Sequence, residues 1–382
     1  MLVSLTDAQL LLRKTVRDYA TKEIAPRAQE LDDREEYPSD LVEGLRSLGL
    51  MGIGIDPEHG GGGGGVTESV IAVEEISRAY AGIGTILAVQ IGLWGQFIQR
   101  FGTPEQKTRF LDPLTQGQLI AAYALTEPDA GSDAAGIQTT ATRDGDVYRI
   151  NGMKTFISCG DVASHFLVFA TVDKGLRDKG ITSFVVPREA PGLSTNKQSG
   201  KMGIRASTTA EVILDNVEIP LANRIGEEGE GFKLAMHILD SSRISVAAQA
   251  LGIAETALEA SLSWAQQRKS FGVQLAQHQG IQFMLADMGT RVDAARLLTY
   301  RAAALKDIGQ PFSKESAMAK LYAAETAMWV ATKAVQIHGG YGYFKEMVVE
   351  RCFRDAKITE IYEGTSEIQR MVIARRMIAG NR

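Results

Sequence analysis

The sequence predicts an α+β protein in which two helical regions flank a region of short strands. Residues 1–118 and 226–382 carry apolar side chains at helical spacing, whereas residues 119–225 hold short β-branched and aromatic segments separated by Gly, Asp, Asn or Pro. A chain of 382 residues is also too long for one small core. We therefore expect three domains: an N-terminal α-helical domain, a middle antiparallel β domain that forms a small barrel or sandwich, and a C-terminal four-helix bundle.

Two capping boxes define helix starts in the N-terminal region. Thr6, with Gln9 three residues later, opens a helix that extends to about Leu31. Thr103 and Gln106 repeat this spacing, with proline at the first helical position, where an N–H group would have no partner. The N-terminal region is therefore expected to begin and end in helices.

Two unusual segments lie between these helices. Residues 79–99 carry no charge, but four glycines and three glutamines make the segment less apolar than a membrane-spanning helix. We expect a buried helix that lines an internal site, and no membrane insertion. Residues 60–65 are six consecutive glycines, and the Val-Thr-Glu that follows lacks the Lys-Ser or Lys-Thr of a phosphate-binding loop. We expect a flexible linker that leads into a helix at Thr67.

The middle and C-terminal regions differ in the lengths of their expected elements. An apolar run at 119–125 predicts a strand that ends before Pro128, because proline cannot continue a sheet ladder. Further strands are expected at 139–143, 147–151, 166–172, 182–187 and 210–214. Long helical patterns then cover residues 231–268, 278–308, 313–338 and 366–379. Short connections between such long helices are typical of a helix bundle.

Composition argues against several classes of function. The formal net charge is −5, and the basic residues form no block that would favour nucleic acid or a membrane surface. Two cysteines, Cys159 and Cys352, are too few for a disulfide framework, and five scattered histidines lack the paired spacing of metal ligands. We therefore expect a cytoplasmic protein without nucleic-acid or membrane partners and without a bound metal.

The segment from Tyr123 to Asp133 is the most informative part of the sequence. It starts as an apolar strand and breaks at Pro128 into a turn of small and hydroxyl residues, in which Gly131 lets the backbone approach another group closely. Hydroxyl and free backbone N–H groups at the end of a strand can hold a flat ring with polar edges. An ordinary turn after a strand has the same pattern, so the segment alone leaves both interpretations open.

Five motifs in one order along the chain point to a family. They are Tyr123–Asp133, Lys154–Ser158, Arg268–Gly272, Gln336–Gly340 and Ile361–Thr365. Together they resemble the acyl-CoA dehydrogenase family, FAD enzymes that oxidise acyl-CoA thioesters to 2-enoyl-CoA. The resemblance covers essentially the whole chain, including the α–β–α order. It implies bound FAD, an acyl-CoA substrate, an electron-transfer flavoprotein as acceptor, a role in fatty acid β-oxidation and a homotetramer.

The resemblance assigns cofactor contacts to three parts of the chain. Residues at the flavin edge and over its faces would be Tyr123, Leu125, Thr126, Ser132, Phe156, Ile157 and Ser158. Residues that reach the FAD of a neighbouring subunit would be Arg268, Ser270, Phe271, Gln279, Gln336, Gly339 and Gly340. Thr365 and Glu367 would complete the set. Plainer interpretations remain open, with Phe156 as a core residue and Arg268 as a solvated arginine at the end of a long helix.

Glu363 is the expected catalytic base. Removing the α-proton of a thioester requires a carboxylate in a site that excludes water, and burial raises the pKa of that carboxyl and makes it a stronger base. One branch of the family places the base just before the helix arginine, but here that position is Ser242, which cannot act as such a base. The plainer interpretation is that Glu363 only stabilises the N-terminus of the helix that follows Gly364.

The remaining motifs concern the substrate. Asp240 and Arg243 lie one turn apart on a helix, where they can form an ion pair, and the resemblance implies that they reach the CoA moiety. Gln249 resembles short-chain members, in which a longer polar side chain makes the acyl pocket shallow; a glutamine on the helix surface is the alternative. Residues 90–94 depart from the family's pocket wall, which leaves branched and cyclic acyl groups open. Further substrate contacts implied by the resemblance are Ser132, Tyr362 and Gly364.

Three hypotheses of different classes follow. The first is an FAD-dependent acyl-CoA dehydrogenase for short-chain, or short branched or cyclic, acyl groups. In it Glu363 takes the α-proton, the β-hydride passes to flavin N5, and the electrons leave to an electron-transfer flavoprotein. The second is an acyl-CoA oxidase that passes electrons to O₂, although the shortness of the chain favours the dehydrogenase. The third is a non-catalytic helical scaffold that has kept the fold.

Overall fold

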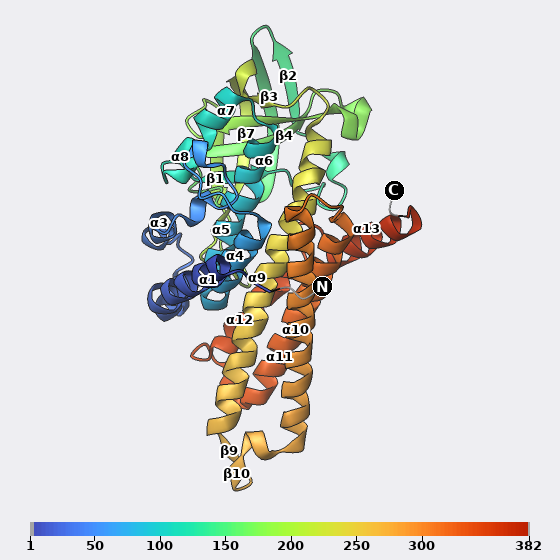
Figure 1. Cartoon of the computed structure of the whole chain (residues 1–382). Coiled ribbons are helices and arrows are strands. Elements are labelled where there is room, and N and C mark those ends of the chain that lie inside the picture. The colour runs from blue at the N-terminus through green and yellow to red at the C-terminus, as the bar shows by residue number, and fades with distance from the viewer. Residues whose placement is uncertain (1–3, 381–382) are drawn as a thin grey trace.

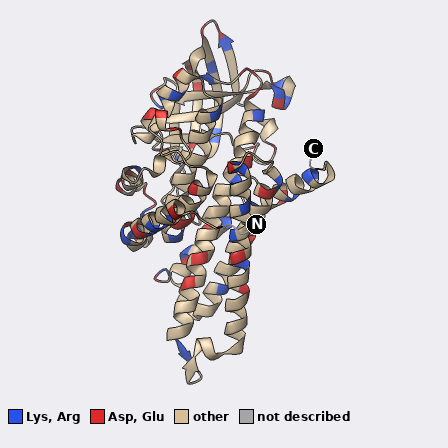
Figure 2. Ribbon diagram, in the orientation of Figure 1, with Lys and Arg blue, Asp and Glu red and all other residues tan. Residues whose placement is uncertain are grey.

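The computed structural model describes residues 4–380, in which helices, a sheet and further helices follow one another along the chain (Figure 1). The predicted α+β fold class is confirmed. In Figure 2 acidic and basic residues are interspersed along the helices and the sheet, as the small net charge suggests. The sheet lies at one end of the molecule and the long C-terminal helices extend to the other end.

The N-terminal region is built from short helices. They are α1 (Asp7–Tyr19), α2 (Ala28–Arg34), α3 (Ser39–Ser47), α4 (Val66–Ala79), α5 (Ala81–Ala88), α6 (Gln96–Phe101), α7 (Pro104–Phe110) and α8 (Asp112–Thr115). Both predicted capping boxes are confirmed, because Thr6 and Thr103 each accept a hydrogen bond from the backbone N–H three residues later. Their partners, Gln9 and Gln106, close the box by accepting from the N-cap backbone.

The six glycines before α4 do not form the flexible linker that the sequence predicts. Their backbone makes hydrogen bonds with the preceding segment, including Gly62 N to Gly52 O at 2.9 Å and Gly63 N to Ile55 O at 3.0 Å. A Cβ atom at Gly61 would lie 2.0 Å from Ile55 O. Glycine is therefore required here for close backbone approach, and α4 begins at Val66 rather than Thr67.

Among the described residues one helical span, Ala81–Phe101, is long and apolar enough to cross a membrane, but 94% of its apolar window is buried inside the protein. It comprises α5, a π-helical segment (Val89–Gly95) and α6. Its interior position agrees with the buried helix expected from the sequence.

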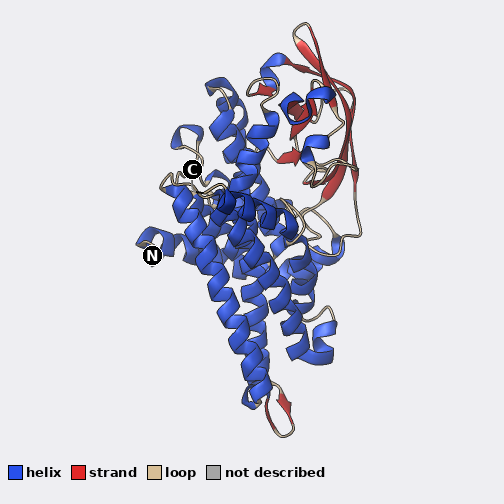
Figure 3. Cartoon of the chain, turned by 90° about the vertical axis from the view of Figure 1, so that its right-hand side faces the viewer, coloured by secondary structure: helices blue, strands red, loops and turns tan. Residues whose placement is uncertain are grey.

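The middle region is a single open, mixed sheet, not the antiparallel barrel or sandwich that we expected. Its strands are β1 (Ala121–Ala124), β2 (Thr140–Asp144), β3 (Val147–Ser158), β4 (His165–Thr171), β5 (Ile181–Pro187), β6 (Leu193–Lys197), β7 (Thr209–Pro220) and β8 (Arg224–Ile225). Their order is β6-β7-β3-β2-β4-β5-β8, with β1 beside β4. In Figure 3 these strands lie together at one end of the molecule. The β1–β4 and β2–β4 pairings are parallel. Nothing in a strand's own sequence specifies these distant partners, so the error lies in pairing and closure.

The C-terminal region holds the four predicted long helices and one more. They are α9 (Gly231–Gln267), α10 (Gln279–Asp307), α11 (Ser313–His338), α12 (Val348–Thr359) and α13 (Ser366–Ile378), with a hairpin of β9 (Lys269–Ser270) and β10 (Val273–Gln274) after α9. The hairpin lies at the far end of the bundle from the sheet, and α13 projects to one side (Figure 1).

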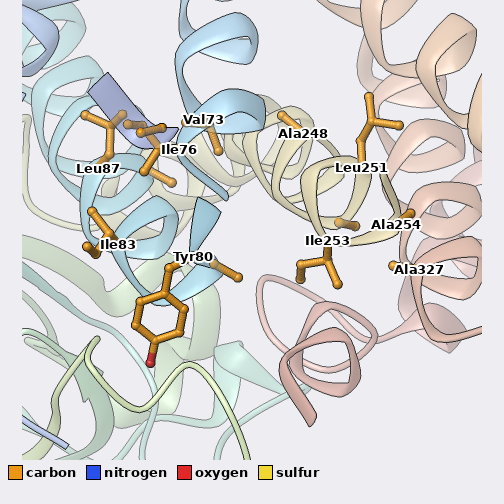
Figure 4. Packing of buried hydrophobic residues seen from close by; sticks show 14 of the residues in the cluster. Val73, Ile76, Tyr80, Ile83, Leu87, Ala248, Leu251, Ile253, Ala254 and Ala327 are labelled. Atoms are coloured by element: carbon orange, nitrogen blue, oxygen red, sulfur yellow. The ribbon is translucent and has the colours of Figure 1, made fainter. Parts of the chain in front are cut away.

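The largest core joins the N-terminal helices to the bundle. Buried side chains of α4 and α5, such as Ile76 and Leu87, lie beside α9, where Leu251 is also fully buried (Figure 4). A Cβ atom at Gly252 would lie 2.5 Å from Glu74 O, so the backbones of α4 and α9 are in close contact. Burying each large aliphatic side chain stabilises the fold by about 1.5–3 kcal/mol. This packing fixes α9, which carries side chains to the site.

Candidate active site

Two adjacent cavities meet at Glu363. The smaller has a volume of about 280 Å³ and the larger about 640 Å³. Both are lined by Thr126, Gly131, Ser132, Phe156, Ser158, Tyr362, Glu363 and Gly364. Most of the residues that the first, second and fifth family motifs led us to select therefore come together around one point, although they are up to about 240 positions apart in the sequence.

The loop after β1 is held in place by a buried ion pair. Lys154 Nζ lies 2.7 Å from Glu127 Oε1 and also donates to Leu125 O at 3.1 Å. The Glu127 carboxylate accepts the Thr139 N–H at 3.0 Å. Burial lowers the pKa of Lys154 to about 8, and the nearby Glu127 opposes this shift. The pair thereby fixes the backbone that presents Thr126 to both cavities.

Phe156 is directed out of the β domain rather than into its core. The register of β3 against β7 shifts between Lys154 and Ile157, and Phe156 has a φ of 58°. Its side chain is 69% exposed and lines both cavities. The alternative interpretation of Phe156 as a core residue is therefore wrong, and the irregular register explains how the ring leaves the sheet.

The larger cavity has the features required by a flat ring with polar edges. The hydroxyls of Thr126, Ser132 and Ser158 lie on its β-domain side, together with the Phe156 ring. A Cβ atom at Gly131 would meet no atom within 4 Å, so the space beside this backbone is open. These residues fit the isoalloxazine of FAD, and Thr365 lines the opposite side of the same cavity.

Glu363 lies in the loop between α12 and α13, in a strained backbone. Its φ is 53° and that of Gly364 is 97°, so two successive residues are left-handed. Its Oε2 atom is buried and has no hydrogen-bond partner among residues 4–380, and the same holds for the hydroxyl of Tyr123 on β1. Both side chains line the smaller cavity. Unsatisfied buried polar atoms on a cavity wall indicate a ligand site.

Burial raises the pKa of Glu363. Hydrogen bonding from Ser242 and the positive charges of Lys320 and Arg243 oppose this shift. Ser242, whose hydroxyl cannot act as such a base, is therefore a neighbour of the expected base. A carboxylate with a raised pKa in a water-poor site is suited to proton removal.

The N-terminus of α13 is capped by a different residue. Thr365 is the N-cap, and its side chain accepts the Ile368 N–H at 3.3 Å. Glu363 is thus not needed as the cap, which removes the main support for its plainer interpretation. Glu367 lies in the first turn of α13 with an exposed side chain and lines neither cavity among the described residues.

Arg243 reaches the smaller cavity, and Asp240 holds it. The two residues form an ion pair in which the Arg243 side chain is only 6% exposed. Arg243 Nε is buried without a partner among residues 4–380. The ion pair that the sequence predicts is present, and one donor remains for a ligand.

Gln249 is buried, so its interpretation as a surface glutamine is wrong. Its Nε2 donates to Ala81 O at 3.1 Å and to Thr85 Oγ1 at 2.6 Å, and its Oε1 accepts from the Tyr362 hydroxyl. Gln249 is not among the cavity-lining residues described, but Tyr362 lines both cavities. Gln249 is therefore connected to the cavities through its hydrogen bond with Tyr362, the residue that precedes Glu363.

Residues 90–94 contribute to the site differently from what the sequence suggests. Gln90 exchanges two hydrogen bonds with the backbone of Ala121 and ties the π-helical segment to β1. Trp94 is fully buried against Phe110 and lies outside both cavities. The apolar wall of the smaller cavity comprises Val89 and Leu93, from the helix expected to line an internal site, and Phe232, Met236 and Leu239, which sequence reasoning missed. Ordinary helical periodicity makes such residues look like core.

A second group of expected cofactor residues lies elsewhere. Arg268 follows Arg243 by 25 residues, which is about 37 Å along a helix axis. Its guanidinium lies 5.2 Å from the Tyr341 ring centre, so the end of α9 meets the segment after α11. This distal group comprises Arg268, Ser270, Phe271, Gln279, Gln336, Gly339 and Gly340, and none of them lines either cavity in the described chain.

The larger cavity also has cationic side chains that sequence reasoning missed. Lys201, Arg354 and Lys357 are among its lining residues. Arg354 and Lys357 lie on α12, the helix that the sequence analysis did not predict. Lys201 donates to the backbone oxygens of Ile204 and Ser207, and burial lowers its pKa to about 8. No motif signalled these residues.

Comparison with known proteins covers the three regions separately and the chain as a whole. Family models for the N-terminal, middle and C-terminal domains of acyl-CoA dehydrogenases match residues 6–118, 122–217 and 229–378. The short-chain specific acyl-CoA dehydrogenase of Clostridium acetobutylicum is 47% identical over 97% of this chain and 98% of that protein.

Solved structures agree with these sequence matches. The butyryl-CoA dehydrogenase of Megasphaera elsdenii superposes with a TM-score of 0.97 at 45% identity, covering 99% of this chain and all of that chain. A chain from a structure named for the electron transferring flavoprotein of Acidaminococcus fermentans has a TM-score of 0.98 at 43% identity, with both chains fully covered. The chain therefore belongs to the acyl-CoA dehydrogenase family and is an FAD-dependent oxidoreductase.

Proposed function

We propose that this protein oxidises short-chain acyl-CoA thioesters to 2-enoyl-CoA, with Glu363 as the base. The observation that carries the proposal is the Glu363 carboxylate, which has one buried, unpartnered oxygen and lies where the two cavities meet. The smaller cavity would take the acyl thioester, and the larger cavity would take the flavin. The Glu363 carboxylate would accept the α-proton as the carbon–carbon double bond forms. FAD, when bound, supplies the acceptor for the β-hydride.

The other residues of the site would bind and orient the two ligands. Thr126, Ser132 and Ser158 would donate to or accept from polar ring edges, and Phe156 would cover one ring face. Arg243 would use its free Nε on the CoA portion, held by Asp240. The Glu363 backbone N–H would donate to the thioester oxygen as negative charge develops there.

Two observations support a short acyl group. The smaller cavity, at about 280 Å³, is small for a long chain. The hydrogen bonds of Gln249 to Thr85 and Tyr362 place buried polar groups directly behind that cavity. A longer chain would have to displace these groups and leave them without partners. The similarity to a short-chain specific relative and to a butyryl-CoA dehydrogenase supports the same choice.

We further propose a homotetramer in which the distal group completes the FAD site of another subunit. Arg268 and Gln279 are exposed and lie far from the cavities of their own chain. Arginine suits a pyrophosphate because its planar guanidinium gives paired donors. A second copy of the chain would bring these residues to the cofactor.

An electron-transfer flavoprotein is the proposed acceptor, and a cytoplasmic location remains our expectation. The likeness to a chain from a structure named for such a flavoprotein supports the acceptor. The alternative is an oxidase that uses O₂. The non-catalytic scaffold is disfavoured by the unpartnered Glu363 oxygen, because a scaffold has no use for an unsatisfied carboxylate.

An anaerobic titration tests the proposal. Butyryl-CoA should bleach the flavin absorbance of the purified protein, and acyl-CoAs of graded length and branching should do so less well. Oxygen consumption without any acceptor protein would identify an oxidase instead. A protein that carries FAD which no acyl-CoA reduces would contradict the proposed function.

A further inference from the structure

Lys320 is a fully buried cation that the proposed chemistry leaves without a role. It lies on α11, and its side chain has an exposed fraction of 0%. Its Nζ donates to the carbonyl oxygen of Gly364 at 2.7 Å. An ammonium group loses several kcal/mol of hydration when it is buried, so its position in the interior calls for an interaction that a neutral side chain cannot provide.

The Gly364 carbonyl that Lys320 contacts belongs to the loop of the base. It also accepts a hydrogen bond from Gln369 Nε2 at 2.8 Å. The two residues that lead up to this carbonyl, Glu363 and Gly364, are both left-handed, with φ of 53° and 97°. A left-handed backbone at a residue other than glycine costs about 1–3 kcal/mol and persists only where its surroundings fix it. The two donors fix it from α11 and α13.

The charge of Lys320 also acts on the Glu363 carboxylate. Burial lowers the pKa of Lys320 to about 8. Among the acidic groups, the charge of Glu363 opposes this shift most. Lys320 thus remains an ammonium at neutral pH. An ammonium beside a buried carboxyl favours its ionised form, which is the form that can accept a proton.

Other groups face the same pair from the surrounding elements. Glu363 is influenced by Ser242 and Arg243 on α9, and it raises the pKa of Tyr123 on β1 and of Tyr362. Lys320 is influenced by Arg243, Glu360 and Glu367. Arg243 is engaged by Asp240, so much of its charge is balanced. Gln369 supplies a hydrogen bond but no charge.

We propose that Lys320 is a positioning residue: it fixes the Gly364 carbonyl, and thereby the direction of Glu363, and it keeps the Glu363 carboxylate ionised at neutral pH. This inference rests on the proposed function, in which Glu363 is the base. A neutral donor such as Gln369 can hold the carbonyl alone. The additional effect of Lys320 is electrostatic, and this effect can be tested separately.

Two sets of variants separate charge from hydrogen bonding. Lys320→Met and Lys320→Gln remove the charge, whereas Lys320→Arg keeps it. Gln369→Leu removes a neutral donor, which contacts the same Gly364 carbonyl at 2.8 Å and the Glu363 carbonyl at 3.4 Å. Lys314→Met is the matched control, because it makes the same substitution on the same helix at a partly exposed lysine that pairs with Glu315. Flavin content and thermal unfolding of each purified holoenzyme report whether the fold is kept.

Two readouts follow the ionisation of Glu363. In the pH profile of acyl-CoA oxidation, the acidic limb of kcat/KM should move up by about one unit in Lys320→Met and Lys320→Gln. It should stay in place in Lys320→Arg, Lys314→Met and Gln369→Leu, although Gln369→Leu should lower kcat. Infrared titration of the carboxyl band, with Glu363→Gln as the blank, should give the same shift without turnover.

The outcomes distinguish this inference from the proposed function. An unshifted profile in a flavin-bound Lys320→Met, with Glu363→Gln inactive, would overturn the role of Lys320 and leave Glu363 as the base. Retained turnover in Glu363→Gln would overturn the proposed function itself. If both neutral Lys320 variants lose flavin and unfold at a lower temperature than Gln369→Leu, Lys320 serves the fold alone and the inference is wrong.

Discussion

The two ends of helix α9 carry two parts of the expected cofactor site. One part lines cavities inside the chain, and the other is exposed on its surface. At the near end, around Arg243, residues of the β domain, of α9 and of the loop before α13 line the cavities within one chain. At the distal end, around Arg268, the expected FAD contacts lie on an exposed hairpin and on exposed helix ends. The comparison teaches that one chain holds the reaction site but only half of each proposed cofactor site. The rigid helix fixes the spacing between the two.

Exposed apolar side chains accompany the distal end. Phe271 is 96% exposed, Tyr343 83%, Phe344 65% and Phe283 60%. Large aromatic groups gathered on a surface usually mark a protein interface. The near end instead buries Trp94 and Phe97, and its exposed Phe156 lines the cavities. A second copy of the chain is thus the occupant that we propose for the distal surface.

Replacing Glu363 should give the largest effect, and it should be confined to the near end. Glu363→Gln keeps the shape of the side chain but removes the base, so turnover should fall about 10³-fold while FAD remains bound. Stopped-flow reduction by butyryl-CoA measures the loss. Glu43→Gln, at an exposed carboxylate paired with Arg46, is the control and should leave the rate unchanged. Loss of FAD from Glu363→Gln would mean that Glu363 also holds the cofactor, which would contradict an effect confined to the base.

Breaking the buried pair of Glu127 and Lys154 should destabilise the near end within a single chain. Glu127→Gln leaves the Lys154 ammonium buried without its partner and should cost about 3 kcal/mol of folding stability. The double variant with Lys154→Met should cost less, because no unpaired charge remains. Thermal unfolding of the holoenzyme measures both, and the loss should not depend on protein concentration. Equal losses in the single and double variants would argue against an unpaired charge as the cause.

Replacing Arg268 should weaken the distal end in a concentration-dependent way. Arg268→Ala removes a donor that we assign to the pyrophosphate in another subunit, so flavin should dissociate about tenfold more readily. Dialysis at several protein concentrations, with absorbance as the readout, measures this. Arg291→Ala is the control, since Arg291 is an exposed arginine of α10 that lies over the Trp329 ring. Flavin retention equal to that of the unchanged protein would place the cofactor site wholly inside one chain.

The sequence predicted a structural feature correctly where residues close together in the chain determine that feature. Capping boxes at Thr6 and Thr103 are local, and both are confirmed. The expected domain limits after residues 118 and 225 stay a prediction. Helix α12 was missed although its buried Val349, Cys352 and Ala356 recur at helical spacing, so the local sequence did carry a signal for it. Sheet closure was wrong because pairing partners are distant in sequence.

The same limit applies to the site. The motif that contains Glu363 identified the loop, but no local pattern distinguishes its raised pKa from that of a surface glutamate. The burial of Lys320 was not expected, since lysine is usually exposed, and for Gln249 a surface position was one of two interpretations left open. Their positions follow from the packing of α9 and α11 against the loop, which only the folded chain reveals.

Asp355 should give the smallest effect, again at the near end. Its carboxyl is buried beneath the loop that holds Ile204, whose N–H it accepts at 2.6 Å, and burial raises its pKa from 3.8 to about 6. Between these two pH values the folded protein holds a proton that the unfolded chain has released, so this group's contribution to stability falls as the pH rises. Asp355→Asn, which can still accept the Ile204 N–H, should therefore be more stable than the unchanged protein at pH 7, and this advantage should vanish near pH 4. Asp33→Asn is the control of opposite sign, because Lys345 lowers the pKa of Asp33. Unfolding midpoints from pH 4 to 8, at two protein concentrations, measure both variants. A difference for Asp355→Asn that changes with concentration would mean that the near end also depends on a second chain.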